Sequence, residues 1–238
     1  MRYLLLWLEA PLQSWGCESR FDQRETFSFP TLSGVFGILL ASSGDSGAQC
    51  ELLERMRGAD FTAVEFLAPN TPSATQLRDY HMVGSGYDRN DKWEALHIPR
   101  KRDGSFAVGG GAKQTFRYYL QNKKFAVLLG LADDLAEKFS ASLQAPVYDL
   151  YLGRKCCAPT DAIFRGLFNT SEEAHAAMRA IGDSKGLKPG KCFVPADPQA
   201  LNEDDAFFIT DVPLEFGERK RYTDRCVQIL ESIPWENP

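Results

Sequence analysis

The 238-residue sequence lacks the features of a membrane, secreted or zinc-binding protein. Its longest early apolar run, Tyr3–Leu8, ends at Glu9 and is too short to span a bilayer. No small-residue cleavage site of a signal peptide is present. The six cysteines form no CxxC pair, and none of the three histidines has metal-ligand spacing from a cysteine or another histidine. The sequence therefore predicts a cytoplasmic protein with reduced thiols, no membrane contact, no metal and no cofactor.

The sequence also has no overall positive charge, since its formal net charge is −5. The distribution is nevertheless uneven. Residues 76–124 hold ten Lys/Arg against five Asp/Glu, whereas residues 197–238 hold four against ten. Anion binding depends on the field within about 8 Å, so the local balance matters more than the sum. Two interpretations stay open: an RNA-binding face with an acidic protein-facing end, or two solvated surfaces of opposite sign.

Hydrophobic periodicity predicts an α+β fold. We expect strands at 3–9, 61–67, 125–131 and 162–168, with helices at 32–41, 51–57 and 133–142 between them. This order is the β-α-β-β-α-β outline of a ferredoxin-like domain over residues 1–168. A helix at 171–181, a connection at 182–198 and strands at 207–210 and 226–230 predict a small β-rich C-terminal extension over residues 169–238.

A polar, glycine-punctuated excursion at about residues 75–117 interrupts the outline. It contains a hairpin signal, Asp103-Gly104. A loop of such length without structure is uncommon inside a compact domain. We therefore expect a long β-hairpin that protrudes from the domain.

Three separated segments combine positive charge with aromatic side chains and glycine: residues 12–36, 76–119 and 148–159. Single-stranded nucleic acid needs such surfaces, because phosphates meet Lys/Arg while bases stack on aromatic rings. The third segment shows no core-packing pattern and carries Tyr151, Arg154 and Lys155. We expect the three segments to form one RNA-binding surface.

The first segment predicts a phosphate site at a helix start. Arg20 and Arg24 precede a helix with Thr31 as its expected N-cap. The helix start at Thr31–Gly34 offers unpaired backbone N–H groups to an anion, with Ser33 and Gly34 as the candidate contacts. The absent side chain at Gly34 lets a ligand approach closely. The alternative is that Gly34 serves helix packing, and Trp15 is expected in the core.

The second segment carries candidate RNA ligands on the hairpin. They are Arg78, Tyr80, His81, Arg100, Lys101, Arg102 and Arg117. His81 is a candidate general base because histidine as a residue type titrates near neutrality, but no nucleophile–base pair accompanies it in the sequence. A hydrogen-bonded structural role is the alternative, so we assign no catalytic residue.

Several stretches, in their order and spacing, resemble the CasD family of CRISPR-associated proteins. The matching stretches are Leu4–Leu8 running into Ala10–Gly16, Phe29–Gly37, Leu77–His81, Tyr119-Leu120 ahead of Phe125, and Tyr151–Lys155 with Pro159. They extend over roughly residues 3–168, and the Arg-Asp-Tyr-His element is most similar to the type I-E branch. The last seventy or so residues carry no matching motif.

The resemblance implies a RAMP-type ferredoxin-like (RRM/RAMP) domain with a long thumb hairpin. It also implies a non-enzymatic subunit of a Cascade surveillance complex for antiviral defence. Such a subunit grips the crRNA 5′ handle, contacts a CasC-type backbone subunit and the large PAM-reading subunit, and meets target DNA through the complex. The runner-up is a metal-independent endoribonuclease that processes precursor crRNA, as in the type I-C branch. The adjacent Lys-His pair of that branch is absent from this sequence. A protein-only scaffold is a third hypothesis.

Overall fold

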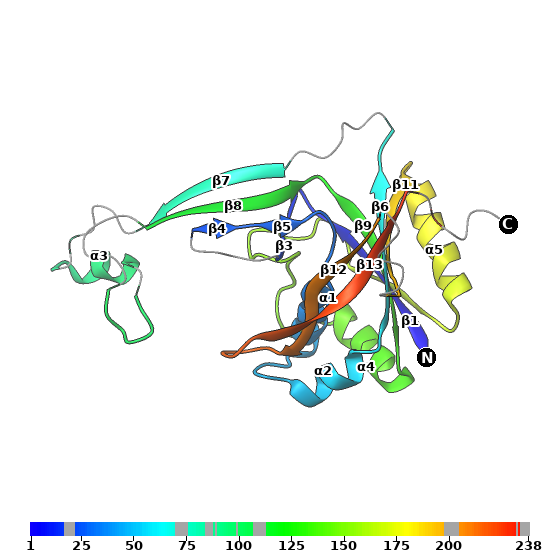
Figure 1. Ribbon diagram of the computed structural model, residues 1–238, viewed down its shortest axis with the longest axis horizontal. Coiled ribbons are helices and arrows are strands. Elements are labelled where there is room, and N and C mark those ends of the chain that lie inside the picture. Colours follow the sequence, from blue (N-terminus) through cyan, green and yellow to red (C-terminus); the bar gives the residue numbers. More distant parts are fainter. Residues whose placement is uncertain are drawn as a thin grey trace.

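A computed structural model describes residues 1–16, 22–69, 76–83, 88, 90–98, 100–106, 113–197, 205–231 and 233 of the protein. Arg20 of the predicted phosphate site lies outside the described residues. The chain forms a mixed α/β structure around a seven-stranded sheet, from which a two-stranded ribbon extends (Figure 1). No helix in the described part of the chain is long and apolar enough to cross a membrane.

The seven-stranded sheet is antiparallel at every pair of neighbouring strands. In spatial order its strands are β10 (Phe164–Phe168), β1 (Arg2–Glu9), β9 (Lys124–Leu131), β6 (Asp60–Leu67), β11 (Lys188–Pro195), β13 (Arg221–Leu230) and β12 (Ala206–Glu215). The apolar run of β1 is fully buried from Leu4 to Leu8, which explains why it lacks polar alternation. Its even-numbered leucines face one core, while Leu5 and Trp7 face a second core on the other side of the sheet.

Helices cover both faces of the sheet. Residues of α1 (Leu32–Ser43), α2 (Cys50–Met56) and α4 (Asp133–Gln144) belong to the core on one face, and residues of α5 (Ser171–Ser184) to the core on the other. The helix predicted after Thr31 is confirmed, because the Thr31 side chain caps its first turn. It ends at Gly44, whose φ of 76° is the left-handed conformation of a glycine C-cap.

The C-terminal residues continue the sheet instead of forming a body of their own. Strands β11, β13 and β12 all lie in the same sheet as β1, so the predicted ranges 1–168 and 169–238 share it. The prediction of a connection at 182–198 is wrong for Lys188–Pro195, because this stretch forms β11 and pairs with both β6 and β13. Its Pro189 and Gly190 suggested a loop, but they lie at a register shift where a missing N–H is tolerated.

The ribbon is an antiparallel pair of β7 (Gln76–Val83) and β8 (Lys113–Gln121). Figure 1 shows it running away from the sheet, with α3 (Lys92–His97) at its far end. At its near end, β8 also pairs with the short strands β2 (Leu12–Gln13) and β4 (Gln23–Arg24), while β3 (Trp15–Gly16) pairs with β5 (Thr26–Phe27). We call β7 and β8 together the long hairpin.

Helix α3 and the turn beside it lie at the far end of the long hairpin. The helix was not predicted, although Asp91 followed three residues later by Glu94 is a capping signal. The Asp91 carboxylate accepts the N–H groups of Trp93 and Glu94, at 2.7 and 3.1 Å. The turn predicted at Asp103-Gly104 is found between the bridged residues Arg100 and Phe106.

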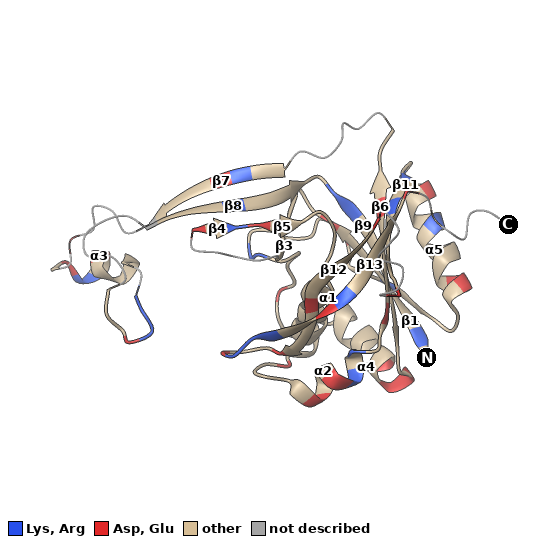
Figure 2. Cartoon of the chain, in the orientation of Figure 1, with Lys and Arg blue, Asp and Glu red and all other residues tan. Residues whose placement is uncertain are grey.

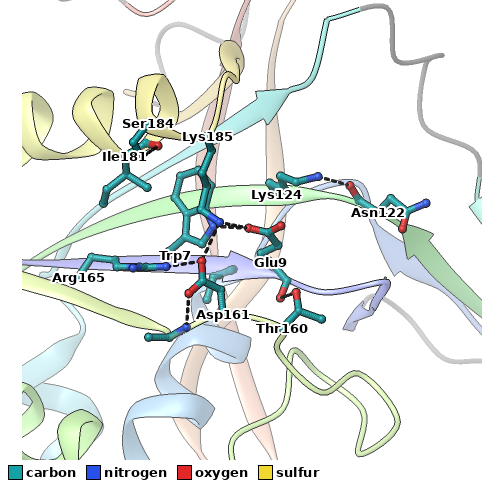
Figure 3. Close-up of polar contacts among 12 residues, drawn as sticks. Trp7, Glu9, Asn122, Lys124, Thr160, Asp161, Arg165, Ile181, Ser184 and Lys185 are labelled. Atoms are coloured by element: carbon teal, nitrogen blue, oxygen red, sulfur yellow. Dashed lines mark hydrogen bonds and ion pairs between the residues drawn. The ribbon is translucent and has the colours of Figure 1, made fainter.

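A half-buried ionic network holds α5 on the sheet (Figure 3). Lys185, just after α5, contacts Glu9 of β1 at 2.9 Å and Asp161 at 2.7 Å. Burial alone would raise the pKa of Glu9, but hydrogen bonds from Trp7 and Lys185 lower it below its ordinary value. Hydrogen bonds to Asp161 and Glu9 raise the pKa of Lys185. The network therefore favours the ionised carboxylate of Glu9 and the charged ammonium of Lys185.

Candidate nucleic-acid interface

The near end of the long hairpin is where the three basic-aromatic segments meet. Strand β4 pairs in parallel with β8, which places Arg24 opposite Arg117. The Arg154 guanidinium donates to the carbonyl oxygens of Tyr118 at 3.2 Å and Arg24 at 2.8 Å. It also lies over the Tyr119 ring, 4.6 Å from the centroid. One side chain thus connects all three segments.

The loop that carries Arg154 is packed tightly against the first segment. The Ser14 N–H donates to the Leu152 carbonyl at 3.1 Å. Gly153 has a φ of 99°, and a Cβ atom there would lie 1.7 Å from the Ser14 carbonyl oxygen. Leu152 and Cys157 are buried in the core, so the expectation that this loop does not pack is wrong for these two residues.

A cleft of about 470 Å³ opens beside this junction, and we call it the base cleft. Five of the predicted RNA-binding residues line it: Arg24, Ser33, Gly34, Tyr151 and Arg154. Two carboxylates, Glu25 and Asp149, line it as well. The Tyr151 hydroxyl lies 3.3 Å from an Asp149 oxygen, and this negative charge raises the pKa of Tyr151. The base cleft therefore has mixed charge with aromatic and hydroxyl groups.

The start of α1 differs from the predicted phosphate site. The Leu32 N–H donates to the Asp211 carboxylate at 2.7 Å, and the Gly34 N–H donates to the Thr31 hydroxyl at 3.2 Å. A Cβ on Gly34 would lie 2.8 Å from the Trp15 ring, so the absent side chain makes room for Trp15. Two of the N–H groups expected to bind an anion thus have protein acceptors, which is a correction to the predicted site.

Trp15 is fully buried, as predicted. Its indole N–H donates to Gln13, whose amide donates to the carbonyl oxygens of Leu8 and Lys123. Gln13 is itself fully buried. These residues fix the base of the long hairpin and do not present polar groups to a ligand.

The predicted residues on the long hairpin lie on opposite faces. Arg78 and Tyr80 share a face, where the Arg78 guanidinium lies 4.1 Å from the Phe116 ring centroid and the Tyr80 ring 5.3 Å from it. Tyr80 is 49% exposed. His81 and Arg117 lie on the other face by the two-residue alternation of a strand.

His81 contacts the carboxylate of Asp79, two residues away on the same face of β7. Both side chains are about one-third exposed, at 37%. This contact fits the structural alternative for His81, and it also describes an oriented imidazole. Asp79 therefore fixes the orientation of the His81 imidazole on this face of β7.

The remaining predicted residues within the described ranges do not line the base cleft. Arg100 donates to the Gly104 carbonyl at 2.9 Å and lies over the Phe106 ring. Exposed Arg102 contacts exposed Glu218 at 3.3 Å, and Lys101 belongs to the same turn. Lys155 is exposed on the Arg154 loop and does not line the cleft.

One wall of the base cleft was missed by the sequence analysis. Phe216, Lys220 and Tyr222 line it from the turn between β12 and β13, where Figure 2 shows a concentration of Lys and Arg. The run Arg219-Lys220-Arg221-Tyr222 was a usable signal of the same type as the other segments. It was hidden because the charge was summed over the acidic range 197–238.

Comparisons with known proteins agree with this architecture. Residues 3–225 match the family model described as CRISPR-associated protein (Cas_Cas5). This match extends well past residue 168, where the recognised motifs end. The chain is 30% identical over 183 residues to the CRISPR system Cascade subunit CasD of Escherichia coli (strain K12), covering 74% of this chain and 75% of that protein.

Solved structures show the same fold. A chain of a CRISPR RNA-guided surveillance complex matches with a TM-score of 0.72 and 22% identity, over 97% of this chain and 90% of that chain. A structure titled Crystal structure of Cas protein matches with a TM-score of 0.58 and 23% identity, over 96% and 94%. On the family model and the E. coli relative, the chain belongs to the Cas5 family of CRISPR-associated proteins.

Proposed function

We propose that this protein is the RNA-binding structural subunit of a type I CRISPR Cascade surveillance complex, of the I-E branch, and that it grips the crRNA 5′ handle. The observation that carries this proposal is the base cleft, where the three basic-aromatic segments meet. The similarity to the Cascade subunit CasD of E. coli supports it independently. The ligand is a single strand, because exposed aromatic faces alternate with cations around the long hairpin.

The proposed fold of the four strands nearest the N-terminal core is a ferredoxin-like domain. Strands β10, β1, β9 and β6 with the helices between them follow the chain order β-α-β-β-α-β, which supports a ferredoxin-like (RRM/RAMP) core. The long hairpin acts as the thumb. Its attachment beside the base cleft, through β4 and Arg154, supports a path in which a strand leaving the cleft runs along β7 and β8.

The residues have different roles in this proposal. Arg24 and Tyr151 contact the handle in the base cleft, and Arg154 shapes the cleft by holding its segments together. Ser33 and Gly34 form the floor. The thumb residues contact the first guide nucleotides, and this group contains Arg78, Tyr80, His81, Arg100, Lys101, Arg102 and Arg117. Arg20 and Lys155 contribute charge beside the cleft.

The proposed partners are the crRNA, a CasC-type backbone subunit and the large PAM-reading subunit, with target DNA reached through the complex. The proposed location is the cytoplasm, without membrane contact. The subunit binds RNA without cleaving it. This last statement is tested by incubating the purified protein with repeat RNA in EDTA. Site-specific cleavage that disappears in His81→Ala would establish the endoribonuclease alternative.

Salt-dependent binding of crRNA tests the main proposal. Each phosphate contact that is lost should reduce the log–log salt slope by about 0.7. Arg24→Ala should show this reduction, and Lys191→Ala should not, because Lys191 lies on β11, does not line the base cleft and pairs with Glu231 at 2.9 Å. Absence of any salt-sensitive RNA retention by the unmodified protein would leave only the scaffold hypothesis.

A further inference from the structure

We infer that the turn between β12 and β13 completes the RNA site: Lys220 binds a phosphate, and the base cleft holds one unpaired nucleotide whose base carries an amino group. This inference rests on the proposed RNA-binding function and adds to it a wall from the C-terminal strands. It also names the class of nucleotide that the cleft accepts.

The cations of the base cleft are not equally available to an anion. The Arg154 guanidinium donates to two main-chain carbonyl oxygens, and Arg24 donates to the Gln23 carbonyl at 3.2 Å. Lys220 is exposed, and within the described ranges it has no hydrogen bond or ion pair. A lysine ammonium is a compact charge that binds phosphate from a flexible stem. Lys220 is therefore the cation best placed to take the phosphate.

The turn that carries Lys220 is held rigidly against the body. The Phe216 N–H donates to the Ala48 carbonyl at 3.0 Å. Gly217, with a φ of 81°, lies so close to Gly47 that a Cβ would be 3.3 Å from its carbonyl carbon. Farther from the turn, the buried Asp211 carboxylate on β12 accepts two hydrogen bonds from Arg225 on β13, at 2.6 and 2.9 Å. Lys220 thus projects from a fixed wall, which limits the entropy lost on binding.

The two carboxylates of the base cleft indicate which part of a nucleotide lies beside them. The ionised carboxylates of Glu25 and Asp149 can accept hydrogen bonds but cannot donate them, so they repel a phosphate and attract amino groups. Adenine, cytosine and guanine each present an amino group on a base edge. Uracil presents two carbonyl oxygens on either side of its ring N–H, and these repel a carboxylate. The cleft should therefore prefer amino-bearing bases to uracil.

The size and aromatic lining of the base cleft agree with one nucleotide. Its volume of about 470 Å³ lies in the range of small-ligand pockets. Tyr222 is 38% exposed and packs edge-on against Phe216, with 6.5 Å between the ring centroids. A ring held in this way offers a preformed stacking face for a base.

Salt titrations test the phosphate contact of Lys220. The probe is single-stranded oligoadenylate of about ten nucleotides, within the usual site size for such proteins. Lys220→Ala in the full chain should weaken binding and reduce the log–log salt slope by about 0.7, while Lys191→Ala keeps the slope. Equal slopes for the unmodified protein and Lys220→Ala would overturn the phosphate assignment. If the unmodified protein itself fails to bind, the proposed function fails instead.

Base preference tests the carboxylates. The unmodified protein should bind oligoadenylate and oligocytidylate about tenfold more tightly than oligouridylate. Replacing Glu25 with Gln and Asp149 with Asn supplies donors as well as acceptors, so the preference over oligouridylate should shrink to within about twofold. Strand stacking in the free oligonucleotides is the same for every variant, so the change in ratio reports the protein alone. An unchanged ratio in the double variant would overturn the assignment of the amino-bearing base.

Discussion

Two walls of the base cleft, the Arg154 loop and the β12–β13 turn, carry similar residues and use them differently. Both present a cation and a tyrosine to the same space. On the first wall, Arg154 donates hydrogen bonds to main-chain carbonyl oxygens. On the second wall, Lys220 is exposed. A basic residue in a recognisable motif, Arg154, thus has a structural role, while the proposed ligand contact comes from a turn without such a motif.

The largest expected effect concerns the backbone of the first wall. Gly153→Ala should destabilise the protein by more than about 4 kcal/mol, because the new Cβ overlaps the Ser14 carbonyl in a left-handed conformation. Denaturant unfolding measures this cost. Gly37→Ala in α1 is the matched control, since nothing lies within 4 Å of its Cβ position, and it should be neutral or slightly stabilising. Similar behaviour of the two variants would show that the loop is not held as described.

The stability of the second wall, the β12–β13 turn, should depend on Asp211. Asp211→Asn removes the buried carboxylate that pairs with Arg225. It should lower the unfolding free energy by about 3 kcal/mol, because the largely buried Arg225 guanidinium then lacks a negative charge beside it. Asp224→Asn on the same hairpin removes an exposed carboxylate that accepts from Thr210, and should cost under about 0.5 kcal/mol. Equal costs would mean that the turn is not anchored through Asp211.

Exchanging lysine and arginine tests directly whether Arg154 has a structural role that Lys220 lacks. Arg154→Lys keeps the charge but loses the forked donor geometry and the contact with the Tyr119 ring, so it should cost about 1–2 kcal/mol. Lys220→Arg should leave unfolding free energy unchanged within about 0.5 kcal/mol. Thermal and denaturant unfolding of both variants provide the measurement. A stable Arg154→Lys protein would remove the contrast between the walls.

The smallest expected effect is the loss of unfolding free energy at low pH. It should leave both walls of the base cleft unchanged, because Glu9 and Asp161 do not line the cleft. The lowered pKa values of Glu9 and Asp161 mean that their ion pairs with Lys185 stabilise the fold above the ordinary carboxyl pKa values. This contribution, about 1 kcal/mol for such partly exposed pairs, is lost as the pH falls through the lowered folded-state values. Unfolding curves of Glu9→Gln should show a weaker pH dependence below about pH 5. An unchanged pH profile would contradict the role of the network.

Much of the fold could be predicted from sequence, because the apolar runs are local signals. The burial of Leu4–Leu8 and the capped helix after Thr31 follow from short stretches of chain. Strand β11 could not be predicted in this way, since its Pro189 and Gly190 are tolerated only through a register shift with β6. That tolerance depends on a partner strand more than a hundred residues away.

The candidate site was predicted only in part, because its local motifs are visible in the sequence and its long-range contacts are not. The meeting of the three basic-aromatic segments was expected, and the structure brings Arg24, Tyr151 and Arg154 to one cleft. The sequence could not show that Arg154 is held by main-chain carbonyl oxygens, because these carry no residue identity. It also could not show that Asp211 accepts from Leu32, 179 positions earlier.

This last contact has a consequence for biosynthesis. Helix α1 emerges from the ribosome well before the carboxylate that accepts its Leu32 N–H, because Asp211 is translated 179 residues later. The nascent polypeptide must therefore wait with an incomplete helix terminus, and one side of the central sheet stays open until β12 and β13 arrive. Termination before position 211 would remove Asp211 and the cleft residues Phe216, Lys220 and Tyr222, so such a product would offer no assembled cleft to RNA.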